Sequence, residues 1–507
     1  MSGTSLTHSE ENRETHLAAN DNSLPAAAKK LPTTLKPNAP YETAVEFYIR
    51  RSRPLIFYRG DLYEWWDTHY RSISVAALRA EIYTFLANAR VKVAVKNDNG
   101  DTEYRTAPFH PDDRCVTKVL DAMKHLERRV FVPDDLDAPC WLKTRGNKPD
   151  PKNLVALSNG ILDLQAKELL DHSPDFLTMT ALPFDYDPDA KCERWEQFVA
   201  ELFPNEATRR EFQKAFGYTL SSDRSQQKMF LLKGPARAGK GVTIRAIVGL
   251  LGRENTVSPK LSDLRQPFGM QQFIGKKAAL FPDERLDKGT SQIVASLLSL
   301  SGEDDVSIQR KHQRNWEGRP TIRIWIATNT MPGFEDASAV IASRFIVFNL
   351  SRSFAGNEDT GLTQTLMKER PGILNWSIEG LHLLQEDGEF KQPAEAAGVI
   401  EQMADIAAPI RAFVDARMAL GEDRSVELDT AYETYKTWCE KAKHRPLSST
   451  KFGPAIHDAF PTVNVCKRGP RGDQVPMLKG IELRGRKPRP ANDNYRDTSQ
   501  ATRKAVA

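Results

Sequence analysis

The spacing of hydrophobic positions separates a folded interior of the chain from two polar ends. Residues 1–40 are rich in Ser, Thr, Asn, Ala and Pro and lack periodic hydrophobicity, so this N-terminal tail is predicted to be disordered. Residues 485–507 are basic and contain prolines, and we expect them to form a second disordered tail. The structured elements are therefore predicted to lie between these two segments.

The first folded segment, 41–195, has the pattern of a small α+β domain. A helical pattern is followed by an apolar strand, a turn at Gly60 and a second strand rich in aromatic residues. Two short apolar runs flank Asn159 and Gly160, a dipeptide that favours the tight turn of a β-hairpin. Two further amphipathic helices are predicted at residues 75–91 and 115–130.

The rest of the chain predicts an α/β core between helical segments. Apolar residues at three- and four-residue spacing predict a helical linker or oligomerisation segment at 196–228. Strands and helices then alternate through 229–352, which is typical of a mostly parallel sheet covered by helices. Residues 353–403 are predicted to be a helical extension. Residues 404–484 carry amphipathic helices and two strands around a basic Gly-Pro loop, which fits a winged-helix module.

Composition narrows the class of protein. A chain of 507 residues exceeds what one hydrophobic core usually serves, so we expect about two to four folded units. No run approaches the roughly 18 apolar residues of a membrane-spanning helix, and the polar N-terminus is unlike a secretory signal, so we expect a cytoplasmic protein without a membrane partner. The five cysteines form no C-x-x-C pair, which disfavours zinc and disulfides.

Net charge by itself does not identify a partner. The 71 Lys and Arg exceed the 67 Asp and Glu by four, which is a weak excess for a nucleic-acid-binding protein. Any sequence evidence for nucleic-acid binding must therefore come from where the positive charge lies along the chain.

A glycine-rich segment between a strand and a helix carries the strongest chemical signal. The apolar run Met229 to Leu232 leads into the sequence GPARAGKG and then into an apolar helix. Glycines let backbone N–H groups close around phosphate oxygens, the helix N-terminus favours anions, and Lys240 can reach the β- and γ-phosphates. We therefore predict that ATP is bound by Gly234, Pro235, Ala236, Arg237, Ala238, Gly239, Lys240, Gly241, Val242 and Thr243.

Two features bear on a magnesium ion. The loop departs from G-x-x-x-x-G-K-[ST] at Gly241, which offers no hydroxyl, so Thr243 is the nearest substitute ligand and water is the alternative. Downstream, an apolar strand pattern ends before Asp283 and Glu284. Asp283 is predicted to hold the water shell of Mg²⁺, and Glu284 to polarise the water that attacks the γ-phosphate. A helix cap after a strand is the alternative explanation of this pair.

Two polar residues adjoin later strands of the same core. Asn329 ends the strand pattern TIRIWIAT, where its amide could contact the attacking water or the γ-phosphate as a sensor, although a simple turn fits as well. Arg344 comes just before another apolar strand. It could reach the γ-phosphate of a neighbouring subunit as an arginine finger, with a surface salt bridge as the alternative.

Between these strands the segment GEDDVSIQRKHQRNWEGRP is predicted to be a β-hairpin with a cationic tip. Cations gathered at a hairpin tip suit phosphate contacts in a nucleic-acid channel, and a solvated charged turn is the alternative. The predicted DNA contacts are Arg310, Lys311, His312 and Arg314.

Taken in order, GPARAGKG, LFPDE, the basic hairpin, IWIATNTMP and ASRF resemble the motifs of superfamily-3 helicases. The similarity is to phage and plasmid primase-helicase proteins related to poxvirus-type nucleoside triphosphatases, and flanking segments such as LSNGILDL extend it over residues 45–485. The resemblance implies an AAA+-like P-loop ATPase core that uses ATP and Mg²⁺. It also implies a homo-hexameric ring that moves on single-stranded or forked DNA during replication of a mobile element.

Carried over by motif, the resemblance makes Lys240 the phosphate lysine, Asp283 with Glu284 the acidic pair, and Asn329 the sensor. It also makes Arg344 the finger and Arg310 with Lys311 the DNA hairpin. Many relatives have two adjacent arginines where this chain has Ser343 and Arg344. Many also carry an N-terminal primase domain that the 40 polar residues cannot replace. We therefore expect no primer synthesis, and a separate primase or polymerase as a further partner.

Two other classes of function remain open from the sequence. An initiator could use ATP as an assembly switch and bind DNA through residues 404–483 without unwinding it. A P-loop kinase would share the glycine loop, but the acidic pair, the basic hairpin and the terminal modules disfavour it.

Overall fold

The computed structural model describes residues 33–36, 38–126, 131–143, 146–282, 291–330, 334, 340–442, 444, 446–470 and 474–485, with the backbone alone at 404, 406 and 407. Most of the two predicted tails and the pair Asp283 and Glu284 therefore lie outside the described residues. The chain divides into two compact units, one from residues 1–51 with 74–127 and the other from 52–73 with 128–507. The segment predicted as one α+β domain, 41–195, contributes to both units.

The first unit combines three helices with a small sheet. Its helices are α1 (Pro40–Arg50), α2 (Val75–Ala87) and α3 (Asp113–Met123), and its strands, in the order β1-β5-β6, are β1 (Thr34–Leu35), β5 (Arg90–Lys96) and β6 (Thr102–Pro108). Ser74 caps α2 by accepting from Ala77 N–H at 3.1 Å, and Phe47 of α1 packs edge-on against Phe85 of α2 at 5.3 Å between ring centroids. The three predicted helices are confirmed.

The second unit begins with small sheets that precede the central one. One has the order β4-β3-β2-β7, and the others have the orders β12-β8 and β11-β10-β9. The predicted turn at Gly60 joins β2 to β3, and the Asn159-Gly160 turn joins β9 to β10. The strands are β2 (Leu55–Tyr58), β3 (Asp61–Trp65), β4 (Tyr70–Ser72), β7 (Phe131–Val132), β8 (Cys140–Trp141), β9 (Leu154–Ala156), β10 (Ile161–Asp163), β11 (Glu168–Leu170) and β12 (Phe176–Leu177).

A five-stranded parallel sheet forms the centre of this unit. Its order is β14-β15-β18-β13-β19, so the chain adds strands on one side of β13 and then places β19 on the other side. The prediction of a mostly parallel sheet is confirmed. The strands are β13 (Met229–Lys233), β14 (Thr256–Val257), β15 (Ala278–Phe281), β18 (Arg323–Thr328) and β19 (Phe345–Asn349).

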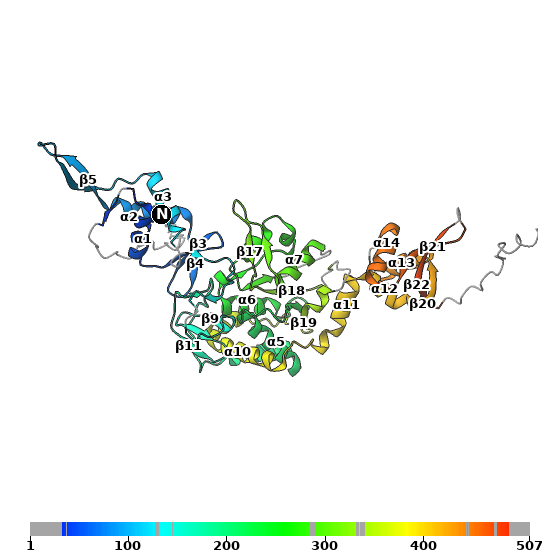
Figure 1. Ribbon diagram of the computed structural model, residues 1–507. Coiled ribbons are helices and arrows are strands. Elements are labelled where there is room, and N and C mark those ends of the chain that lie inside the picture. Colours follow the sequence, from blue (N-terminus) through cyan, green and yellow to red (C-terminus); the bar gives the residue numbers. More distant parts are fainter. Residues whose placement is uncertain are drawn as a thin grey trace, which may run out of the picture. The chain divides into compact units, whose positions relative to one another are not determined.

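Alternate residues of the central strands enter two separate cores. Phe230, Trp325 and Phe348 face a core shared with the helices α4, α5, α6 and α10. Figure 1 shows α5, α6 and α10 in the same part of the molecule as strands β18 and β19. Leu231, Ile326 and Val347 face a second core shared with α7, α8 and α11. The helices are α4 (Glu193–Leu202), α5 (Glu206–Leu220), α6 (Lys240–Leu251), α7 (Ser291–Ser301), α8 (Val340–Ser343), α9 (Leu362–Lys368), α10 (Arg370–Asp387) and α11 (Ala397–Ala407).

Helices α5 and α10 approach closely through glycines. A Cβ atom at Gly217 would lie 2.3 Å from Leu381 N, and one at Gly380 would lie 2.1 Å from Gln213 O. These contacts exclude any side chain at either position, so the helix pair on this face of the sheet depends on both glycines.

The predicted basic hairpin is present between α7 and β18. Its strands β16 (Val306–Ile308) and β17 (Trp316–Gly318) pair antiparallel, with Ser307 opposite Glu317.

The C-terminal part of the chain contains three helices and a three-stranded antiparallel sheet of order β20-β22-β21. The helices are α12 (Pro409–Arg417), α13 (Leu428–Ala442) and α14 (Ser449–Ala459), and the strands are β20 (Met418–Glu427), β21 (Asn464–Arg468) and β22 (Val475–Leu483). The sequence predicted helices and two strands here, and it missed β20. Strand β20 pairs with β22 across a register shift between Leu420 and Ser425, which hides its strand periodicity. No helix in the described part of the chain is both long and apolar enough to span a bilayer.

Candidate functional site

Three strand ends meet at one edge of the parallel sheet. Because the strands run in the same direction, the carboxyl ends of β13, β18 and β15 lie side by side, with Lys233 opposite Thr328 and Phe281 opposite Ile326. The glycine loop follows β13, and Gly234 N–H bonds to Thr328 O at 3.2 Å. Ligands of open α/β sheets bind outside this edge, where the strand order reverses direction.

A cavity of about 870 Å³ opens at this edge, which is ample for a nucleotide. The glycine loop lines it from Ala236 to Val242, and Pro282 and Asn329 line it from the ends of β15 and β18. Among the described residues, the lining contains five cations, Arg194, Arg237, Lys240, Arg245 and Arg352, and three carboxylates, Glu201, Glu358 and Asp359. The cavity therefore favours an anionic ligand.

The glycine loop is bent into the helix by a left-handed residue. Gly239 has φ +92°, and a Cβ atom there would lie 2.6 Å from Cδ2 of Leu202 on α4. Helix α6 begins at the next residue, so its free N–H groups and its dipole are directed at the cavity. The sequence alone predicted this strand, loop and helix arrangement, and the structure confirms it.

Lys240 lies within the loop. Its ammonium donates to Gly234 O at 2.8 Å and to Pro235 O at 2.6 Å, and the residue is 8% exposed. The Lys240 ammonium is therefore held at the cavity wall by two neutral carbonyls. An anionic ligand could take the place of these carbonyls and form a stronger, charge-assisted hydrogen bond.

Thr243 is placed differently from the position expected of a metal ligand. It is fully buried, and its hydroxyl donates to Gly239 O at 3.3 Å inside the first turn of α6. It does not line the cavity, whereas the exposed Gly241 does. Asp283 and Glu284 follow Pro282 directly, but they lie outside the described residues.

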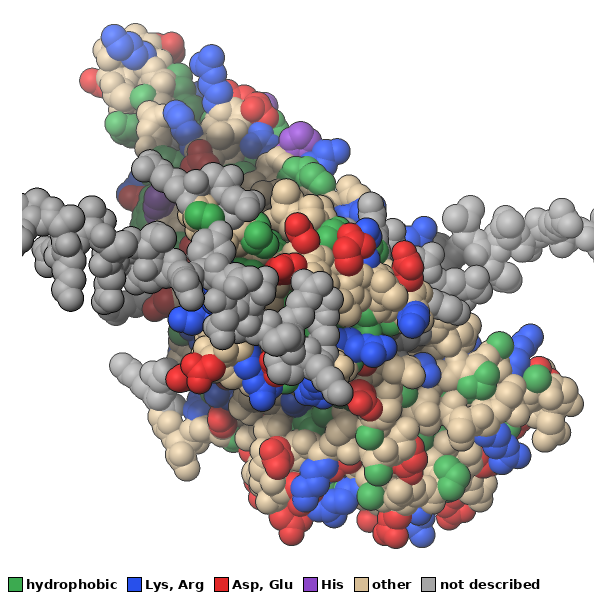
Figure 2. Space-filling view, turned by 90° about the vertical axis from the view of Figure 1, so that its right-hand side faces the viewer, with side chains coloured by type: hydrophobic (Ala, Val, Ile, Leu, Met, Phe, Trp, Pro, Cys, Tyr) green, Lys and Arg blue, Asp and Glu red, His purple; other side chains and the backbone are tan. Residues whose placement is uncertain are grey.

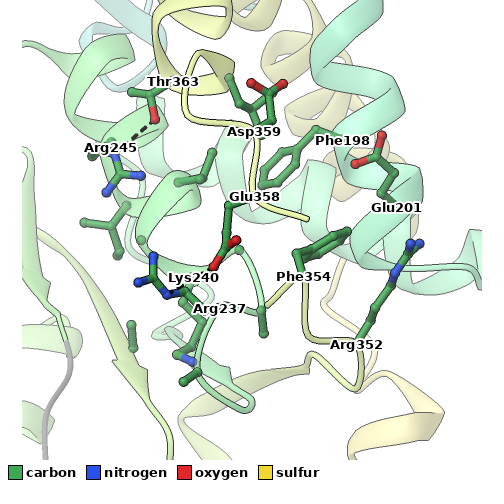
Figure 3. Close-up of a pocket in the computed structure, with 18 of the residues that line it drawn as sticks. Phe198, Glu201, Arg237, Lys240, Arg245, Arg352, Phe354, Glu358, Asp359 and Thr363 are labelled. Carbon is green, nitrogen blue, oxygen red and sulfur yellow. Dashed lines mark hydrogen bonds and ion pairs between the residues drawn. The ribbon is translucent and has the colours of Figure 1, made fainter. Parts of the chain in front are cut away.

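The opposite wall is a segment that the sequence did not indicate. Residues 352–363 follow β19, and they are bonded to the glycine loop by Phe354 N–H to Arg237 O at 2.9 Å and Ser353 Oγ to Ala236 O at 2.9 Å. Figure 3 shows Glu358 meeting Arg237, an ion pair of 3.6 Å, and the ring of Phe354 facing the cavity. The segment has no periodic pattern or motif, so only its tertiary contacts identify it.

Arg344 lies at the other edge of the sheet. It precedes β19, whose five residues run parallel to β13, so roughly 16 Å of strand separates Arg344 from the glycine-loop edge. Its guanidinium donates to Gln227 Oε1, and the nearby Lys228 donates to Ser343 O at 2.7 Å. Burial, and then the charge of Arg344, lower the pKa of Lys228.

The four cations predicted to bind DNA fall into two pairs. Lys311 and His312 are exposed at the turn of the hairpin. Arg310 is 5% exposed and forms an ion pair with Asp61 at the β2–β3 turn, and Arg314 pairs with Asp134 at 2.7 Å. Contrary to the expectation from sequence, Arg310 does not offer its charge at the tip, because Asp61 neutralises it inside the protein.

On the face seen in Figure 2, the surface charges of the described residues do not mark a separate binding site for nucleic acid. Figure 2 shows Lys and Arg interspersed with Asp and Glu over the described residues of the face it views. Among the described residues, no group of three or more His, Cys, Asp or Glu side chains could hold a metal ion.

Known protein families match three segments of the chain. Residues 112–204 match the family described as D5 N terminal like, residues 232–344 match a family of unknown function, DUF5906, and residues 408–485 match the RFX DNA-binding domain. The first is a family of primase-helicase N-terminal segments, and the last is a family of DNA-binding domains.

Solved structures with similarity to the chain include two of the NrS-1 C-terminal region. The apo A form is 11% identical with a TM-score of 0.47, covering 87% of this chain and 98% of that one. The apo structure of residues 305–718 is 9% identical with a TM-score of 0.47, covering 87% of this chain and 99% of that one.

Proposed function

We propose that this chain is an ATP-driven motor on DNA, a helicase of the superfamily-3 kind that acts in the replication of a phage, plasmid or related element. The observation that carries the proposal is the convergence of Lys240, Pro282 and Asn329 on one cavity at the carboxyl edge of the parallel sheet. The matches to a D5 N-terminal segment and to a DNA-binding domain, on either side of this core, support a role in replication.

The residues of the cavity fit a nucleoside triphosphate. The N–H groups of loop 236–242 and the start of α6 would bind the phosphates, and Lys240 would exchange two loop carbonyls for phosphate oxygens. The ring of Phe354 offers an apolar surface for the base. Bound Mg²⁺-ATP would supply the phosphoanhydride whose hydrolysis drives movement.

The remaining roles rest on the sequence motifs, because Asp283 and Glu284 lie outside the described residues. Asp283 would hold the water shell of Mg²⁺, with water in place of Thr243 beside Gly241, because the Thr243 hydroxyl is engaged by Gly239 O. Glu284 would polarise the attacking water, and Asn329 would orient it through its amide.

Arg344 would act on the cavity of a second copy. It lies at the opposite edge of its own sheet, so it suits a finger supplied in trans, as in a homo-hexameric ring. Lys311, His312 and the salt-bridged Arg314 are exposed on the hairpin and would contact the DNA backbone. The winged-helix arrangement proposed for residues 404–484 would bind duplex DNA.

The test is ATP hydrolysis with and without single-stranded DNA, together with unwinding of a forked duplex. Wild-type protein should hydrolyse ATP faster with DNA and unwind the fork, and Lys240→Ala should abolish both activities. Lys368→Ala, which removes an exposed lysine outside the cavity, is the matched control and should leave both unchanged. Unwinding that survives Lys240→Ala would refute the motor.

The match of residues 408–485 to a DNA-binding domain also favours a second candidate, an initiator that binds duplex DNA and uses ATP as an assembly switch. Such a protein would bind duplex DNA tightly and hydrolyse ATP slowly, without stimulation by DNA and without unwinding.

A further inference from the structure

The first unit carries a β-ribbon, formed by β5 and β6, that is exposed on both faces. Figure 1 shows it extending from the helices of that unit. Within the described part of the chain, β5 pairs with β1 only at Arg90 and Val91, and beyond them β5 and β6 pair only with each other, up to Lys96 opposite Thr102. An isolated two-stranded ribbon is marginally stable in water, so this ribbon adds little to the stability of the fold. Its exposed side chains are therefore candidates for a binding role.

One face of the ribbon combines cations with an aromatic ring. Side chains alternate along a strand and directly opposed residues share a face, so Lys92, Lys96 and Tyr104 lie together, with Tyr104 opposite Ala94 between the two lysines. Tyr104 is 69% exposed, and both lysines are exposed. Four residues of strand place the two lysines roughly 13 Å apart along the ribbon.

The charges on the other face neutralise each other. Glu103 lies opposite Val95 and Arg105 opposite Val93, and the two charged side chains form an ion pair of 3.2 Å. The paired residues on the lysine face include no carboxylate, and the other members of this face are the exposed Arg90 together with Ala94, Thr102, Thr106 and Pro108. The ribbon therefore has one cationic, aromatic face and one face of valines with compensated charge.

We propose that the face formed by Lys92, Lys96 and Tyr104 binds single-stranded nucleic acid. Lysines spaced along a strand can contact successive phosphates, while an exposed aromatic ring between them can stack on an unpaired base. A second copy of the chain is a poorer occupant, because lysines on an exposed strand disfavour pairing with another strand edge. This contact is separate from the proposed motor and requires no ATP.

The experiment measures binding of the full chain to a fluorescent oligothymidylate by anisotropy, without nucleotide and over a series of salt concentrations. Lys92→Ala/Lys96→Ala should weaken binding and reduce the slope of log affinity against log salt by about 1.4, since each phosphate contact on a single strand contributes roughly 0.7. Tyr104→Ala should weaken binding at least about fivefold and leave the slope unchanged, and Tyr104→Phe should bind like wild type.

Arg105→Ala is the matched control, because it removes a cation from the other face of the same ribbon. The proposal is overturned if Arg105→Ala lowers the slope as much as one lysine substitution does, or if the double lysine variant binds like wild type. Circular dichroism of each variant separates loss of binding from loss of fold. Lys240→Ala should bind the oligonucleotide through the ribbon as wild type does, so failure of the motor and failure of this site are distinguishable.

Discussion

Arg310 of the basic hairpin forms a buried ion pair with Asp61, a residue 249 positions earlier in the chain. The Arg310 side chain is 3% exposed, and the guanidinium also donates to Arg314 O at 2.9 Å and to Arg59 O at 3.3 Å. The same junction holds Arg59, which pairs with Asp137 at 2.7 Å and lies over the Trp316 ring at 4.9 Å. The hairpin is therefore fixed to the β2–β3 turn, and Lys311 and His312 remain exposed.

Substitutions at this junction should affect stability and DNA binding separately. Asp61→Ala should lower the free energy of unfolding by about 3 kcal/mol, because it leaves the Arg310 charge buried without its partner. Lys311→Ala should change stability by less than about 0.5 kcal/mol and weaken binding to single-stranded DNA. Urea unfolding and anisotropy titrations on both variants check the prediction. A loss of stability in Lys311→Ala equal to that in Asp61→Ala would contradict it.

The two glycines of the phosphate loop should respond in opposite ways to substitution. Among the described residues, a Cβ atom at Gly241 would meet only the Arg245 guanidinium, at 3.3 Å, so Gly241→Ser should be tolerated and should stabilise α6 by about 0.5 kcal/mol. Its new hydroxyl should lower the Mg²⁺ concentration needed for half-maximal ATP hydrolysis.

Gly239→Ala should instead weaken nucleotide binding at least about tenfold, roughly 1.4 kcal/mol, because φ +92° and the contact with Leu202 exclude a side chain. Calorimetric titration with a non-hydrolysable ATP analogue measures both variants. Equal affinities for the two would show that the loop does not hold the phosphates.

Subunit mixing should detect action of Arg344 in trans. Lys240→Ala and Arg344→Ala should each lose ATP hydrolysis. An equal mixture should recover up to about one quarter of wild-type activity, because that fraction of interfaces joins an intact loop to an intact finger. Gln227→Ala removes the partner of the Arg344 side chain within its own chain and should retain activity. If subunit exchange is demonstrated and the mixture still recovers no ATP hydrolysis, a finger in trans is refuted.

Stability in acid should depend on His69. Burial, and then the charge of Arg71, lower its pKa to about 4, and Arg71 Nε donates to His69 Nε2 at 3.2 Å, which requires the neutral ring. The unfolded chain therefore binds one more proton between about pH 4 and 6.5, so this contribution to stability is full above pH 6.5 and is lost as the pH falls toward 4. The slope is at most about 1.4 kcal/mol per pH unit.

His69→Gln should flatten the pH dependence of the free energy of unfolding in this window. His110→Gln, at an exposed position, serves as the control and should leave the dependence unchanged. The measurement is urea unfolding at a series of pH values, and identical curves for wild type and His69→Gln would contradict the assignment.

The sequence by itself determined the elements whose signals are local. The apolar run, glycine loop and helix around Lys240, the Asn159-Gly160 hairpin and the strand just before Asn329 all appear as predicted, because periodicity and turn residues act over a few neighbouring positions. The parallel sheet followed from the alternation of strands and helices. Strand β20 escaped prediction because a register shift interrupts its alternation.

Only the tertiary structure decided which charged residues are buried and what closes the cavity. Arg310 and Lys311 are adjacent cations with the same local pattern, and they differ because Asp61, distant in sequence, meets one of them. Segment 352–363 forms a wall of the cavity because Ser353 and Phe354 each donate one hydrogen bond to the glycine loop. Burial and long-range pairing depend on contacts between distant parts of the chain, and no window of neighbouring residues contains that information.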